Sequence, residues 1–83
     1  MPATQLTIYS RPGCHLCDEM KQVVASVAER FELAITEINI DTDPELEKMY
    51  GWEIPVLLIE GVKIAKYRIS EEQLTRALAG RAG

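Results

Sequence analysis

Two cysteines three positions apart carry the clearest chemistry in this sequence. Cys14 and Cys17 directly follow the turn-forming pair Pro12-Gly13, and a strand-like segment precedes that turn. Positions i and i+3 of a helix are neighbours, so the two sulfur atoms can reach each other. A Cys-x-x-Cys pair that opens a helix after a strand is typical of a dithiol that forms and breaks a disulfide.

The two thiols have different expected roles. A helix that begins at Cys14 places this residue where backbone N–H groups lack intrahelical partners and the helix dipole is positive, which favours a thiolate. Cys17 falls on the apolar stripe of the same helix, so we expect it to stay buried and protonated. Cys14 is therefore the predicted nucleophile and Cys17 the resolving cysteine. Their disulfide would be the redox group, with no further cofactor.

A metal site and a pair of inert buried thiols are the alternatives for these cysteines. Structural zinc takes four ligands, commonly Cys and His, whereas the chain holds two cysteines and one histidine. An iron–sulfur cluster would need cysteines from two chains. We predict no metal in the site. A non-enzymatic binding module or an iron–sulfur carrier stays the alternative function, which the colour and iron content of freshly purified protein would separate from a redox enzyme.

Four other side chains are candidates for a role near the cysteines. His15, between them, could tune the thiolate by hydrogen bond or charge, or could be solvated without a role. Arg11 could stabilise the Cys14 thiolate or bind a substrate carboxylate, or could also be solvated. Tyr50 and Trp52 could form an apolar rim for a protein substrate or pack beneath the sheet.

Hydrophobic periodicity predicts the elements that position these residues. Residues 5–9 alternate as a strand, and apolar residues then recur at helical spacing, at Cys17, Met20, Val24, Val27 and Phe31. The segments expected next are a strand over 33–40, a helix over 44–50 capped by Asp43, a strand over 54–59 and a hairpin strand over 62–66.

The last helix opens with a capping box at Ser70–Gln73 and is expected to stop at Gly80, which leaves residues 80–83 as a loose end. The resulting order, β-α-β-α-β-β-α, predicts an α/β fold with a mixed four-stranded sheet and helices on both faces. The 83 residues, 1–83, suffice for a single domain.

Charge and hydropathy narrow the range of partners. The formal net charge is −4, a sign that repels phosphate backbones and anionic membrane surfaces, so we expect neither nucleic acid nor membrane as a partner. The first residues do not show a basic region followed by an apolar stretch. We therefore expect a cytoplasmic protein, and we expect it to be a monomer.

The sequence resembles the thioredoxin superfamily, and most closely its small glutaredoxin-like branch. The resemblance rests on Arg11–Cys17, Asp41–Pro44 and Tyr50–Ile59, and it covers nearly the whole chain. It implies a thioredoxin-like fold and thiol–disulfide oxidoreductase activity. It also implies a cis peptide bond between Ile54 and Pro55, in a loop that faces the active-site helix and pairs with the backbone of a bound thiol substrate.

Three segments depart from the glutaredoxins that bind glutathione strongly. Those proteins carry Cys-Pro-Tyr-Cys, Thr-Val-Pro and a Gly-Gly followed by an acidic residue, whereas this chain has Cys-His-Leu-Cys, Glu53–Pro55 and Lys66–Ser70. We therefore expect weak glutathione binding, with disulfide-containing proteins as the better substrates. Glutathione and a donor of the thioredoxin-reductase type both stay open as sources of electrons.

Overall fold

The computed structural model describes residues 3–81, and its elements follow the predicted order. They are β1 (Thr4–Ser10), α1 (His15–Val27), β2 (Leu33–Asn39), the 3₁₀ turn η1 (Ile40–Thr42), α2 (Pro44–Tyr50), β3 (Val56–Ile59), β4 (Val62–Lys66) and α3 (Glu71–Arg81). Within residues 3–81, none of the helices has the length and apolar character needed to cross a membrane.

The strands form one mixed sheet in the order β2-β1-β3-β4. β1 runs parallel to β2 and antiparallel to β3, and β3 and β4 form a hairpin, as predicted. Glu60 and Gly61 both have positive φ at the hairpin turn, the conformation that matches the twist of the paired strands. β3 begins at Val56, two residues later than predicted, because Pro55 has no N–H to donate to a neighbouring strand.

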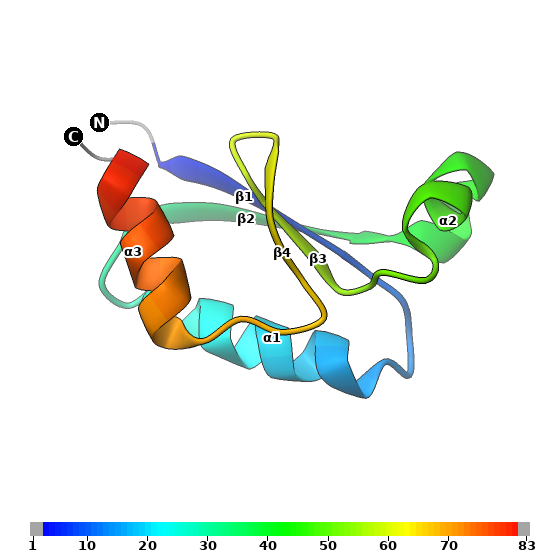
Figure 1. The fold of residues 1–83 in the computed structure, drawn as a ribbon, viewed down its shortest axis with the longest axis horizontal. Coiled ribbons are helices and arrows are strands. Elements are labelled where there is room, and N and C mark those ends of the chain that lie inside the picture. Colours follow the sequence, from blue (N-terminus) through cyan, green and yellow to red (C-terminus); the bar gives the residue numbers. More distant parts are fainter. Residues whose placement is uncertain (1–2, 82–83) are drawn as a thin grey trace.

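The main core lies between the sheet and the helices α1 and α3, which cover one face of it (Figure 1). Alternation along β1 turns Leu6 and Ile8 toward these helices and Tyr9 toward the opposite face. There Tyr9 stacks on Tyr50 at the end of α2, with ring centroids 4.7 Å apart. Helices on both faces are thus confirmed, with the second face covered at the α2 end. The core is built from Leu6, Ile8, Met20, Val24, Val27, Leu57, Ile59, Ile69, Leu74 and Leu78.

Side chains cap two of the helices as the sequence predicts. The Asp43 carboxylate accepts the N–H of Glu45 at 2.9 Å, which starts α2. Before α3, the Ser70 hydroxyl accepts the Gln73 N–H at 3.1 Å, and the Gln73 side chain accepts the Ser70 N–H at 3.0 Å. These reciprocal bonds form the capping box.

Three further predicted limits are wrong, besides the start of β3. α1 ends at Val27, and Phe31 lies in the turn that follows, where it packs against the core and so mimics helical spacing. β2 ends at Asn39, because the Asn39 side chain accepts the N–H of Asp41 at 2.9 Å and starts a 3₁₀ turn. α3 continues through Gly80, since an interior glycine weakens a helix by about 1 kcal/mol without ending it. Residues 82–83 of the expected loose end lie outside the described range.

Candidate active site

Cys14 caps the N-terminus of α1. Its backbone is extended, with φ −91° and ψ 110°, and its Sγ accepts the N–H of Cys17 at 3.1 Å. The sulfur therefore partners one of the N–H groups that have no acceptor within the helix. The same donor and the positive end of the helix dipole would stabilise a thiolate at this atom. The predicted position of Cys14 at the start of the helix is confirmed.

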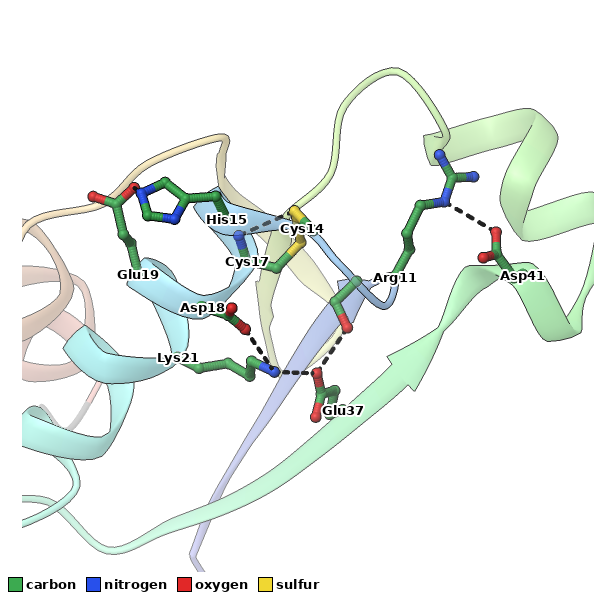
Figure 2. The surroundings of a disulfide bond; sticks show 10 residues. Arg11, Cys14, His15, Cys17, Asp18, Glu19, Lys21, Glu37 and Asp41 are labelled. Carbon is green, nitrogen blue, oxygen red and sulfur yellow. Dashed lines mark hydrogen bonds and ion pairs between the residues drawn. A yellow bond between two sulfur atoms is a disulfide. The ribbon is translucent and has the colours of Figure 1, made fainter.

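Cys14 and Cys17 form a disulfide, with their Cα atoms 5.2 Å apart (Figure 2). Cys17 is 1% exposed, whereas Cys14 is only partly buried. An external thiol can therefore approach the Cys14 sulfur but not the Cys17 sulfur. Within residues 3–81, no group of three or more His, Cys, Asp or Glu side chains is arranged to hold a metal ion. The site supports redox chemistry by the disulfide itself.

The segment before β3 lies at the same edge of the sheet as the cysteines. β3 is antiparallel to β1, so its first residue, Val56, pairs with Tyr9 near the end of β1, from which the chain runs to Cys14. The bond between Ile54 and Pro55 is cis, as the resemblance implies. The hydrogen bonds among the described residues include none to the backbone of Ile54. Its role in substrate binding stays a prediction.

His15 and Arg11 both point away from the sulfur atoms (Figure 2). The His15 side chain is 89% exposed, and its Nε2 lies 3.4 Å from the carboxylate of Glu19, one turn along α1. The Arg11 Nε donates to Asp41 at 3.0 Å. The structure therefore brings neither side chain to the Cys14 sulfur, and it leaves Arg11 at the edge of the site as an ion-paired cation.

A polar network beside the disulfide was not predicted from the sequence (Figure 2). The buried Ser10 hydroxyl donates to Glu37 of β2 at 2.8 Å, and Lys21 of α1 lies 2.9 Å from the same carboxylate and 3.4 Å from Asp18. The hydrogen bond from Lys21, followed by that from Ser10, lowers the pKa of Glu37, and the same contact with Glu37 raises the pKa of Lys21. The network fixes α1 to the ends of β1 and β2.

The aromatic residues near the Ile54-Pro55 segment divide between packing and exposure. Tyr50 stacks on Tyr9 of β1, so it packs against the sheet instead of forming an exposed rim. Trp52, in contrast, is 92% exposed. Sequence reasoning did not single out Tyr67. Its backbone N–H donates to the Pro55 carbonyl at 2.8 Å and its hydroxyl donates to the Trp52 carbonyl at 2.7 Å. Tyr67 thus holds both ends of the segment.

Comparison with known proteins identifies the family. Residues 5–79 match the family model "Glutaredoxin-like domain (DUF836)". The Glutaredoxin-like protein YDR286C homolog of Dictyostelium discoideum is 35% identical over 75 residues, which are 83% of this chain and 69% of that protein. Among solved structures, target protein XcR50 from X. campestris is 32% identical with a TM-score of 0.76, over 90% of this chain and 96% of that one.

A more distant structure supports the fold alone. Chloroplastic thioredoxin z is 18% identical, with a TM-score of 0.77 over 98% of this chain and 80% of that one. The mixed sheet, the three helices and the disulfide at the start of α1 agree with the thioredoxin fold. The chain therefore belongs to the glutaredoxin-like domain family, and it has the thioredoxin fold.

Proposed function

We propose that this protein is a thiol–disulfide oxidoreductase that reduces or exchanges disulfides of proteins. The observation that carries the proposal is the difference between the two cysteines. Cys14 accepts a helix N-terminal hydrogen bond and is accessible, whereas Cys17 is buried behind it. This arrangement suits a nucleophile followed by a resolving thiol.

In the proposed cycle, the Cys14 thiolate attacks one sulfur of a substrate disulfide. A mixed disulfide forms at Cys14, and the other substrate sulfur leaves as a thiolate that takes up a proton. The Cys17 thiol then loses its proton and attacks the Cys14 sulfur, which releases the second substrate thiolate. Two electrons have passed to the substrate, and the protein holds the Cys14–Cys17 disulfide of this structure. A dithiol or two glutathione molecules would reduce it again.

The edge of the sheet offers groups for docking the substrate chain. Ile54 has a backbone N–H and C=O without a hydrogen bond among the described residues, so an extended substrate segment can pair with it. Pro55 beside it is buried and held by Tyr67. Arg11, at the start of the turn before Cys14, is expected from the sequence to bind a substrate carboxylate, but its ion pair with Asp41 opposes this role.

Trapping of the mixed disulfide tests this mechanism. Reduced Cys17→Ser protein, mixed with a disulfide-containing model protein such as insulin, should accumulate a covalent complex that dithiothreitol dissolves. Cys14→Ser should form no such complex, because the buried Cys17 cannot attack a bulky disulfide. Wild-type protein should turn over without accumulating the complex. Accumulation in Cys14→Ser, or no reduction of insulin by the wild type, would contradict the proposal.

A further inference from the structure

Trp52 is a large apolar side chain held outward by a fixed backbone. Its carbonyl accepts the Tyr67 hydroxyl at 2.7 Å, and the next residue, Glu53, donates its N–H to Tyr50 at 2.8 Å. The Glu53 carboxylate is in turn held by Lys63 at 2.9 Å. The indole is nevertheless 92% exposed. A rigidly presented, exposed tryptophan is typical of an anchor at a protein interface.

Trp52 and Arg11 line one shallow depression together with Glu47 and Gly51, with a volume of about 140 Å³. Arg11 stands three residues before Cys14, so their Cα atoms are at most about 11 Å apart. A group bound in this depression is therefore close enough to belong to the chain that carries the target disulfide.

The charges of the depression select a cation. Arg11 is neutralised by Asp41, 3.0 Å away, while Glu47 takes part in no ion pair among residues 3–81. Glu47 is exposed on α2. A carboxylate without an ion pair next to the open face of an indole attracts an ammonium or guanidinium group, by charge and by cation–π contact. The net charge of −4 also attracts cationic groups over a longer range.

We propose that this depression receives a lysine or arginine side chain of the substrate protein, located within a few residues of its disulfide. The inference rests on the proposed function, since it names the class of disulfide protein that the site takes. The cation lies between the Trp52 ring and the Glu47 carboxylate, and the adjoining substrate segment extends toward Ile54 and Cys14. Selectivity for basic substrates then comes from α2 and the loop after it, outside the cysteine motif.

Two matched pairs of synthetic peptides test the inference. In the first pair, each peptide contains an internal disulfide. The two peptides differ at one position, three residues from a cysteine, where one has arginine and the other has glutamate. The second pair has the same sequences with both cysteines replaced by alanine. The chain contains one tryptophan, so the fluorescence of Trp52 reports binding of the cysteine-free peptides directly. Single-turnover reduction by pre-reduced protein, with acid quench, reports the reaction of the disulfide peptides.

The arginine peptides should bind and react about tenfold better than the glutamate peptides, with the difference shrinking as salt is added. Glu47→Gln should reduce the preference to about threefold or less, in binding and in rate. Trp52→Ala, read by rate because it lacks the fluorophore, should do the same. Glu29→Gln is the matched charge control, because this exposed glutamate lies beyond the far end of α1, and it should keep the full preference.

The two readouts separate the inference from the function beneath it. Equal binding of the arginine and glutamate peptides, or a preference that Glu47→Gln leaves intact, overturns the basic docking site even if both disulfides are reduced. Preferential binding of the arginine peptide without reduction of either disulfide supports the site and contradicts the oxidoreductase. A preference for the glutamate peptide would assign the depression to Arg11 and an acidic partner, and would also overturn the inference.

Discussion

Glu37 is the residue through which α1 is fixed to the sheet beside the disulfide. It accepts hydrogen bonds from the buried Ser10 at 2.8 Å and from Lys21 at 2.9 Å. Its side chain is 45% exposed, so solvent screening keeps the stabilisation small despite the good geometry. Its importance is positional, because a shift of α1 relative to β1 would move both cysteines.

We predict that Glu37→Gln lowers the thermal midpoint by about 2–4 °C at neutral pH and by less in acid. The pKa of Glu37 is held below its ordinary value of 4.5, first by Lys21 and then by Ser10. Its contribution is therefore present above pH 4.5 and is lost as the pH falls below 4.5 through the lowered pKa. Thermal unfolding at about pH 7 and pH 3 checks this.

Glu37→Gln also tests how the stability depends on alkaline pH, because it removes the charged partner of Lys21. The pKa of Lys21 is raised from 10.5, so its contribution is complete below that pH and is lost as the pH rises further. Glu29→Gln serves as the control, since Glu29 is exposed beyond the end of α1. An equal loss of stability by Glu37→Gln at both acidic and neutral pH would show that the carboxylate charge is not what holds α1.

The residue-scale features that the sequence predicts are those whose partners are close in the chain. Cys14 bonds to Cys17, and Asp43 and Ser70 cap helices within three residues. The Arg11–Asp41 pair spans 30 positions, so nothing in local spacing reveals it. The pairing of Glu37 could have been anticipated. Glu37 lies opposite Ile8 of the central strand β1, on the face toward α1, where a charged residue needs a polar partner.

At the scale of elements, the segment from β4 to α3 braces the loop from α2 to β3. Tyr67 adopts φ +68°, a left-handed conformation that costs a non-glycine residue about 1–2 kcal/mol. In return, its N–H binds the Pro55 carbonyl and its hydroxyl binds the Trp52 carbonyl. A glycine could adopt this backbone without strain but could not reach Trp52. Tyr67 therefore positions residues 52–55, the proposed docking segment for the substrate.

We predict that Tyr67→Phe raises KM for a protein disulfide about three- to fivefold with little change in kcat, because one hydrogen bond to the docking segment is lost. Tyr67→Gly should raise KM at least as much while unfolding at the same or a higher temperature, since it relieves the positive φ. Steady-state reduction of insulin and thermal unfolding measure the two effects. If KM follows stability across both variants, Tyr67 has only a structural role.

The order and number of elements follow from periodicity in the sequence, but their ends depend on packing. β1 and β4 are predicted within one residue, because alternation and the hairpin turn are local signals. The spacing of Phe31 matches the stripe of α1, although only the folded turn shows that it reaches the core from outside the helix. Likewise, Leu74 and Leu78 pack α3 into the core, and the helix continues beyond Gly80 to Arg81.

At the scale of the whole molecule, the cations near the site are already engaged by carboxylates. Arg11 lies 3.0 Å from Asp41, Lys66 lies 3.8 Å from Glu53, and Arg68 lies 4.0 Å from Glu19. The chain as a whole carries a net charge of −4. An anionic tripeptide such as glutathione must therefore compete with intramolecular partners and approach against the overall field.

We predict weak glutathione binding and slow turnover of glutathione mixed disulfides compared with protein disulfides. Asp41→Asn should lower KM for a glutathionylated peptide about threefold, since it weakens the hold on Arg11 and reduces the negative charge, whereas Glu29→Gln reduces the charge without freeing a cation near Cys14. An assay coupled to glutathione reductase measures both. Rapid turnover by a Cys17→Ser variant that keeps Asp41 would show that glutathione binds well although the cations are engaged. Glutathione mixed disulfides, and not protein disulfides, would then be the better substrates of Cys14.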